Sequence, residues 1–229
     1  MDTRSRIIEV AAELLSGSVS GDISTRAVCD AAGVQQPVLY RLFGDKDGLL
    51  AATVDFVWEQ YLGMKRAAEQ SEDPLADLRS GWDSHTAFAL AHPNAYKLLF
   101  ATTWATEPGS AEEAMRLLRV VLDRLAAQGR LRVPPAVAAQ MVMSANTGVA
   151  LALVQRPAQY PGPDLSASVR DAIHRAILLE RSAADPADDA RGAAVNTLAV
   201  GLDDLAADGT FTTNEASMLG EWLRRIPTR

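Results

Sequence analysis

The side chains best suited to chemistry in this 229-residue chain are amide, phenol and guanidinium groups that lie close together near the N-terminus. A glutamine amide pairs with N6 and N7 of adenine, and an arginine guanidinium pairs with O6 and N7 of guanine or with a phosphate. A small apolar side chain beside them contacts a thymine methyl group. The residues expected to read bases are Gln36, Pro37, Val38, Tyr40 and Arg41, Gln35 is a further expected DNA-binding residue, and those expected to meet phosphates are Thr25 and Arg26.

Two short helices joined by a glycine turn would position these groups. Residues 24–32 predict the first helix, and the second begins near residue 36 with Pro37 in its first turn. Gly33 supplies the turn because glycine enters the left-handed backbone region without steric cost. The pattern is a helix-turn-helix, whose second helix lies in the DNA major groove. The residues expected to face inward are Ala27, Val28, Ala31, Ala32, Leu39, Leu42 and Phe43.

Within this segment the sequence resembles the TetR family of transcriptional repressors. The matching residues are Ala32-Gly33-Val34, Pro37, Leu39-Tyr40-Arg41, Phe43, Lys46 and Leu49-Leu50. The resemblance covers about the first fifty residues and implies a homodimer that binds a double-stranded DNA operator and a small-molecule effector. It also implies that Lys46 and the Tyr40 hydroxyl contact the DNA backbone. Packing within the head for Tyr40, and plain solvent exposure for Gln35, remain open alternatives.

The hydrophobic periodicity predicts an all-α fold. An N-terminal helix-turn-helix domain over residues 1–50 precedes a helical ligand-binding and dimerisation domain over residues 51–229, in which residues 186–229 form a hairpin extension. Small side chains over 136–154 and 165–181 favour a four-helix dimer interface, with an internal helix pair as the alternative. The other expected helices cover residues 3–16, 46–69, 75–91, 93–104, 111–128, 187–207 and 213–225, and the stripe Leu50, Val54, Val57, Tyr61 and Met64 should be buried.

Large and polar side chains of the body are candidates for an effector pocket, which the resemblance places between the body helices. Asn146 and Gln140 lie on an otherwise apolar helix and could orient a mostly apolar ligand. Each aromatic or methionine side chain has core packing as its alternative, and His85 and His92 have the alternative of surface or capping positions. The expected ligand-binding residues are Trp82, His85, Phe88, Tyr96, Phe100, Trp104, Met115, Gln140, Met143 and Asn146.

The charge balance argues against broad nucleic-acid binding. The net charge is −7, and residues 1–50 carry five basic against seven acidic side chains. We therefore expect modest DNA affinity that falls steeply with salt. No signal-peptide core and no apolar run long enough to cross a bilayer is evident, so a cytoplasmic location is expected. The lone Cys29 is expected to pack inside its helix.

Enzymatic and metal chemistry find little support in the sequence. His85, His92 and His174 stand apart from any nucleophile, phosphate-loop or metal-ligand pattern, so no catalytic residue, metal or cofactor is expected. The segment from Asp204 to Glu215 partly matches a calcium-binding loop. The favoured alternative is a turn in which Thr212 and Glu215 form a helix capping box.

Two functional hypotheses follow. The first is a homodimeric repressor that leaves a palindromic operator when a small molecule binds its body. The second is a protein-interaction module whose DNA-binding head is weakened by its acidic charge.

Overall fold

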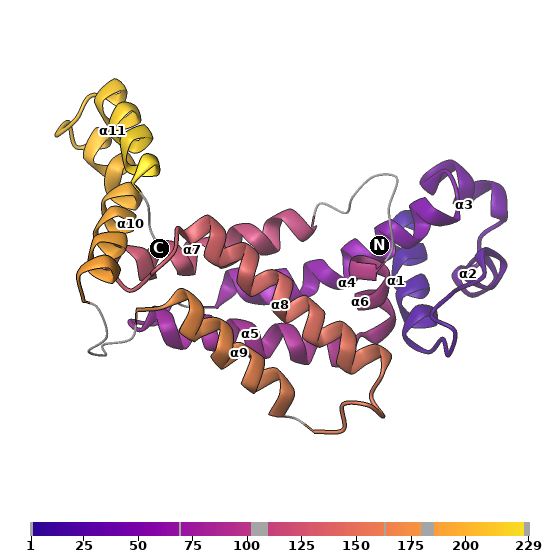
Figure 1. The fold of residues 1–229 in the computed structure, drawn as a ribbon. Coiled ribbons are helices and arrows are strands. Elements are labelled where there is room, and N and C mark those ends of the chain that lie inside the picture. The colour runs from indigo at the N-terminus through magenta and orange to yellow at the C-terminus, as the bar shows by residue number, and fades with distance from the viewer. Residues whose placement is uncertain (1, 69, 102–109, 163, 180–185, 227–229) are drawn as a thin grey trace. The chain divides into compact units, whose positions relative to one another are not determined.

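The computed structural model describes residues 2–68, 70–101, 110–162, 164–179 and 186–226, and the described residues form helices and no strands (Figure 1). This confirms the predicted all-α fold. The helices are α1 (Thr3–Ser16), α2 (Thr25–Ala32), α3 (Gln36–Phe43), α4 (Lys46–Ala67), α5 (Pro74–Ala91), α6 (Pro93–Ala101), α7 (Ser110–Ala127), α8 (Pro135–Gln155), α9 (Asp164–Ile177), α10 (Pro186–Ala207) and α11 (Thr213–Arg225).

The chain divides into two compact units. The first comprises residues 1–69, 84–114 and 147–161, and the second comprises residues 70–83, 115–146 and 162–229. Helices α5, α7 and α8 contribute residues to both units. The predicted boundary at residue 50 separates a DNA-binding function from a ligand-binding function, and it does not coincide with the boundary between the two compact units. This functional division stays a prediction.

In the first unit, α1 packs against α2, α4 and α6, and α3 packs against α2 and α4. The apolar side chains of α1 recur at helical spacing and are buried, which explains why this helix holds the others together. Val28 and Leu39 are fully buried and anchor the two short helices. Burial of one such side chain stabilises a fold by roughly 1.5–3 kcal/mol. The buried residues of α1 are Ile7, Ile8, Ala11 and Leu15.

The junction between α3 and α4 is tight. Asp45 caps α4 by accepting a hydrogen bond from the Gly48 backbone N–H at 2.7 Å. A Cβ atom at Gly48 would lie 2.1 Å from the Phe43 carbonyl oxygen. Only glycine fits this position, because the obstacle is backbone and cannot move aside as a side chain can.

In the second unit, hydrogen bonds join α10 to the end of α7 and to the segment that follows it. The Thr197 hydroxyl donates to the Ala126 carbonyl at 2.8 Å, and the Asn196 amide donates to the Leu131 carbonyl at 3.2 Å. Leu122 and Leu125 of α7 are fully buried. These contacts fix α10, from which the C-terminal hairpin continues.

The α10–α11 hairpin has its own small core, formed by Leu202, Ala216 and Leu223. Gly209 follows the end of α10 and opens the connecting turn with φ of 81°, and Thr212 caps α11. Figure 1 shows the two helices side by side. The extension hairpin predicted from the sequence is thus present as a helical pair.

Several local expectations are corrected. Helix α9 ends at Ile177 and not at residue 181, because the following backbone pairs instead with residues 130–132: the Arg132 N–H donates to the Ile177 carbonyl at 2.9 Å. Met64 is 67% exposed, whereas the rest of its predicted stripe is buried. Ala27 and Ala31 are exposed because α2 turns Val28, Cys29 and Ala32 inward.

Among the described helices, α8 is long and apolar enough to cross a membrane, with a mean hydropathy of 1.6 over its most apolar window. The expectation that no run reaches this length is therefore wrong by length and composition. These properties are weak evidence of a span, because core helices of globular domains share them. Asn146 of α8 is buried and donates to the Trp82 carbonyl at 3.2 Å, as expected for a helix packed on protein.

Candidate nucleic-acid interface

Helix α3 presents polar side chains to solvent around a single apolar anchor. Leu39 is fully buried, and Val38 is half-buried. Tyr40 is 42% exposed, so its ring is not buried in the core of the head. The other predicted DNA-binding residues of this segment, Gln35, Gln36, Pro37 and Arg41, are also exposed. The structure therefore brings the predicted base-reading residues together on one short helix and its N-cap.

The turn that sets the angle of α3 depends on Gly33. Its φ of 64° and ψ of 38° lie in the left-handed region, and the Val34 N–H closes the turn by donating to the Cys29 carbonyl at 3.0 Å. A Cβ at Gly33 would meet nothing within 4 Å. Glycine is needed here for its backbone conformation and not for space.

The N-terminus of α2 is open to an external anion. Ser24 occupies the N-cap position but makes no side-chain capping hydrogen bond. The first-turn N–H groups and the helix dipole therefore favour a phosphate at this end. Thr25 is half-buried beside it. Arg26 is exposed, and its guanidinium lies 4.0 Å from the Asp30 carboxylate. An ion pair this long and this exposed to water is weak, so the guanidinium stays available for a DNA phosphate.

Lys46 differs from Arg26 because it is already engaged. Its ammonium lies 2.6 Å from one oxygen of Asp22 and donates to the other at 2.7 Å. This hydrogen bond lowers the pKa of Asp22, so the carboxylate stays charged and competes with a phosphate for the same ammonium. Sequence reasoning missed this role of Asp22, because 24 residues separate the pair and no local pattern joins them.

Four of the predicted ligand-binding residues gather in a buried aromatic cluster of the first unit. Ring centroids of Tyr96 and Phe100 lie 4.6 Å apart, and those of Trp58 and Phe88 lie 4.7 Å apart. His85 joins them through a hydrogen bond of 2.7 Å between its Nε2 atom and the Tyr96 hydroxyl. Trp58 belongs to the same cluster, although it was not predicted to contact a ligand.

Burial changes the protonation of this cluster. Desolvation, with the charge of Lys65, lowers the pKa of His85 to about 4, so its ring is neutral near pH 7. Desolvation also raises the pKa of the Tyr96 hydroxyl and that of Tyr61, the latter to about 12. Surface or capping placement of His85 is therefore wrong. His92 is exposed, and its carbonyl accepts the Tyr96 N–H at the start of α6.

Lys65 completes the polar side of the cluster and was not among the predicted contacts. Its ammonium donates to the Ser84 hydroxyl and lies 5.5 Å from the centroid of the Tyr61 ring. Burial lowers the pKa of Lys65 because the charged form loses hydration. From the sequence alone, a lysine on helix α4 would be expected to be exposed to solvent. The contact between Lys65 and Ser84 is revealed only by the packing of α5 near this residue.

Other predicted ligand-binding residues lie in the second unit and do not form part of this cluster. Trp82 is buried, and its indole N–H donates a hydrogen bond to the Ser166 hydroxyl at 2.9 Å. Its backbone carbonyl accepts a hydrogen bond from the Asn146 side-chain amide. Met115 and Met143 are half-buried, whereas Gln140 is exposed. Trp104 lies outside the described residues. Of the ten predicted residues, His85, Phe88, Tyr96 and Phe100 therefore share one cluster of the first unit, and the ligand-binding role of the whole set stays a prediction.

The tail loop forms a cap. The Thr212 backbone N–H and hydroxyl both donate to one Glu215 oxygen at 2.8 Å, and these bonds lower the pKa of the carboxyl. The Glu215 N–H in turn donates to the Thr212 hydroxyl at 3.3 Å. Within the described parts of the chain, no group of three or more metal-ligating side chains could hold an ion. The geometry agrees with the capping-box interpretation.

Comparison with known proteins connects this head to a family. The family described as "Bacterial regulatory proteins, tetR family" matches residues 7–53. Nucleoid occlusion factor SlmA of Marinomonas sp. (strain MWYL1) is 26% identical over 128 residues, which are 56% of this chain and 64% of that protein. The HTH-type transcriptional regulatory protein RaaS of Mycobacterium tuberculosis is 38% identical over 74 residues, or 32% and 34% of the two chains. The match spans less than two thirds of either relative.

Similarity to solved structures extends through the body. The crystal structure of NalD, the secondary repressor of the MexAB-OprM multidrug efflux pump in Pseudomonas aeruginosa, has a TM-score of 0.54 and 19% identity to this chain. The alignment covers 78% of this chain and 96% of NalD, which shows a shared fold. The family match thus identifies residues 7–53 as resembling the DNA-binding head of bacterial regulatory proteins of the tetR family, and the likeness to NalD shows that the helical body shares the fold of that protein.

Proposed function

We propose that the protein is a homodimeric, cytoplasmic repressor that binds a palindromic operator and leaves it when a small, mostly apolar molecule enters the body. The observation that carries the DNA-binding half is the exposed surface of α3, where Gln36, Tyr40 and Arg41 face solvent around buried Leu39. A recognition helix of this kind reads one half-site, and a two-fold dimer reads an inverted repeat.

The proposed dimer forms through α8 and α9. Only 33% of the most apolar window of α8 is buried within the chain, so much apolar surface stays open for a partner. Both helices expose residues at spacings of three or four positions, and most of these are small, which allows close approach of paired helices. These residues are Val137, Gln140, Ser144 and Gly148 on α8, and Ser168, Ala172 and Ala176 on α9.

The proposed effector site is the aromatic cluster of the first unit. Trp58, Phe88 and Phe100 supply apolar surface, and the His85–Tyr96 pair supplies a hydrogen-bonding group. Such a combination suits a mostly apolar ligand with one polar group. Helix α4 carries Trp58 and also begins with Lys46 at the head, so a ligand that shifts α4 changes the DNA contacts. The ligand must bind more tightly to the state with low operator affinity.

Selection of bound duplexes from a random DNA library, at low and near-physiological salt, tests the proposal. Enrichment of an inverted repeat that Arg41→Ala and Tyr40→Ala no longer bind supports a dimeric reader. The operator then allows ligands to be screened by release. Failure at both salts with a folded dimer would favour the protein-interaction module, for which neutralisation of Lys46 by Asp22 is the structural argument.

A further inference from the structure

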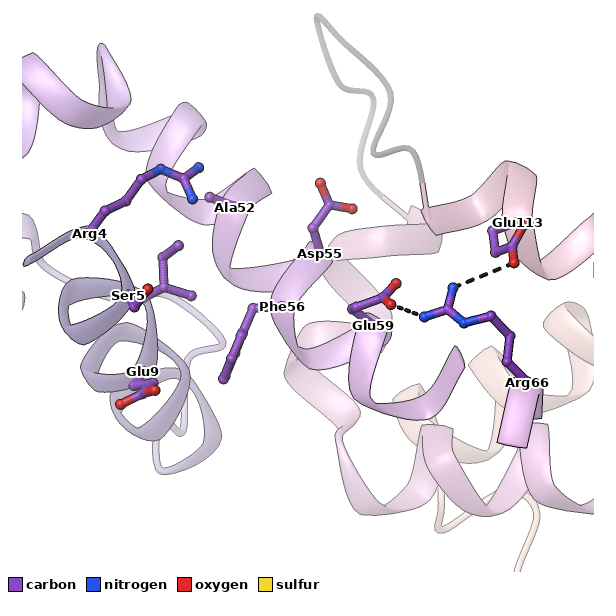
Figure 2. Close-up of a pocket in the computed structure, with 10 residues that line it drawn as sticks. Arg4, Ser5, Glu9, Ala52, Asp55, Phe56, Glu59, Arg66 and Glu113 are labelled. Carbon is purple, nitrogen blue, oxygen red and sulfur yellow. Dashed lines mark hydrogen bonds and ion pairs between the residues drawn. The ribbon is translucent and has the colours of Figure 1, made fainter. Parts of the chain in front are cut away.

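Two ionisable side chains, one in each unit, have opposite surroundings. In the groove between α1 and α4 of the first unit, Arg66 is bound by Glu59 and, at 3.5 Å, by Glu113, as the dashed lines of Figure 2 mark. In the second unit, His174 of α9 is 4% exposed, and among the described residues neither of its ring nitrogens has a hydrogen-bond partner. A buried polar atom without a partner has lost its bonds to water and destabilises the packed state.

His174 lies on the face of α9 that packs against α5. Three residues recur there at every fourth position, Ser166, Arg170 and His174, and all contact α5. The Trp82 indole N–H donates to the Ser166 hydroxyl at 2.9 Å, and the Arg170 guanidinium donates to the Asp83 carboxylate at 2.7 Å. The His174 and Trp82 rings meet edge-on, with centroids 6.4 Å apart and planes at 82°. The two polar neighbours therefore bond to α5, and His174 contributes a ring contact.

The charged groups that face His174 come from both helices. Arg79 and Asp83 lie on α5, and Arg170 and Asp171 lie on α9. Arg170 also donates to Asp171 at 3.0 Å, so its guanidinium engages both carboxylates. Helix α8, which also packs on α5, contains no charged residue. Burial, together with the positive charges of Arg79 and Arg170, lowers the pKa of His174 to about 4, so its ring is neutral near pH 7.

We propose that His174 is an acid-sensitive latch: when its ring gains a proton, it leaves its place beside Trp82, and α9 separates from α5. The imidazolium has two N–H donors that need acceptors or water. Both carboxylates nearby are already bound to Arg170, whose own charge, with that of Arg79, repels the added proton. The packed state is the one that the cation destabilises.

The sign of the pH dependence follows from the two states of the ring. In the separated state the ring is hydrated, and its pKa returns to about 6.5, the ordinary value for histidine. The packed state therefore has its full stability above pH 6.5 and loses stability as the pH falls toward 4. Because α9 belongs to the proposed dimer interface, opening of the latch also weakens the dimer and lowers operator affinity in acid. This last consequence rests on the proposed function.

Hydrogen exchange of the α9 backbone amides, followed by mass spectrometry on the full chain without DNA, tests the latch. Wild type and His174→Leu are compared at the same pH, so the ratio of their exchange rates is free of the intrinsic effect of pH. Between pH 7 and pH 5 this ratio should rise about twentyfold, because protonation favours the separated state by that factor. His174→Gln, which is polar but does not titrate, should behave as His174→Leu does.

His92→Gln is the matched control, because it removes an exposed histidine of the first unit and should keep the wild-type pH dependence in α9. Equal pH dependence of α9 in wild type, His174→Leu and His174→Gln would overturn the proposal. A rise of the ratio that is as large in α1 as in α9 would mean global unfolding and would also overturn it. The exchange measurement needs no operator, so its failure is distinct from failure of the proposed repressor function.

Discussion

The chain contains two helical hairpins with the same local device and different surroundings. In α2–α3 and in α10–α11, a glycine with positive φ lies where the first helix ends and the turn begins, Gly33 at 64° and Gly209 at 81°. The α2–α3 hairpin is held from outside by α1 and α4, and its own caps lack side-chain hydrogen bonds. The α10–α11 hairpin has a full capping box and a small internal core.

Their exposed surfaces differ as well. The second helix of the head exposes Gln36, Tyr40 and Arg41, groups that pair with bases and phosphates. The second helix of the tail exposes Trp222 at 52% and Met218 at 46%, which offer DNA no such contacts. A glycine turn between two helices is therefore weak evidence of DNA binding, and the support and surface of the second helix decide the function.

The largest expected difference between the head and the tail is the loss of stability caused by a glycine-to-alanine substitution in each. Gly48→Ala should destabilise the head by about 3 kcal/mol, because its Cβ would lie 2.1 Å from a backbone oxygen. Gly220→Ala in the tail meets only movable side-chain atoms, of Leu202 at 3.2 Å and of Arg224 at 3.6 Å, and the higher helix propensity of alanine offsets these contacts to within about 1 kcal/mol. Urea unfolding followed by circular dichroism measures both.

Gly63→Ala is the control within α4, since a Cβ there meets nothing within 4 Å, and it should stabilise the protein slightly. If Gly48→Ala lowers the free energy of unfolding no more than Gly220→Ala does, the α3–α4 junction is not held by close backbone contact.

The second prediction separates the two exposed surfaces. Arg41→Ala should weaken binding to the selected operator by about 10- to 100-fold, which corresponds to roughly 1–3 kcal/mol for one base or phosphate contact. Trp222→Ala should leave operator affinity unchanged. Fluorescence anisotropy with labelled duplex measures both variants at one salt concentration. Equal losses in the two would mean that the tail also contacts DNA.

The third prediction concerns capping. Thr212→Ala should cost about 1 kcal/mol of stability, whereas Ser24→Ala should cost only a few tenths, because Ser24 makes no capping hydrogen bond. The contribution of Glu215 also depends on pH. Its pKa is lowered from 4.5 in the folded state, so its stabilisation is present above pH 4.5 and is lost as the pH falls through the folded value.

Unfolding curves between pH 3 and pH 7 test this sign. The wild-type chain should lose more stability than Thr212→Ala as the pH falls, since the variant no longer lowers the pKa of Glu215. Identical pH dependence in the two chains would argue against the capping box.

The smallest expected effect is a gain. Asp22→Asn releases Lys46 from its ion pair and should tighten operator binding about threefold, within the range of an exposed salt bridge. Asp47→Asn makes the same charge change beside Lys46 without an ion pair in the described structure, and should tighten binding less. Anisotropy titrations at two salt concentrations compare them. Weaker binding by Asp22→Asn would mean that Asp22 holds Lys46 in position for a phosphate.

The order of the helices and the surface of α3 could be predicted from the sequence. Hydrophobic spacing, Gly33, Pro37 and the Thr212–Glu215 pair are local signals, because helix formation, turns and caps depend on residues a few positions apart. The end of α9 could not be predicted, since its last expected turn is replaced by backbone pairing with residues 130–132. The effector residues were predicted as one set, but residue type alone does not show which side chains meet.

By itself, the sequence therefore determined an all-helical chain with a TetR-type head and an extra C-terminal hairpin. The tertiary structure decided which charges are available and which polar groups are buried. It paired Lys46 with Asp22, buried His85 against Tyr96 and opened a groove between α1 and α4. The physical reason is that these contacts join residues far apart in the chain, and their energies depend on distance and solvent exposure, which no local pattern specifies.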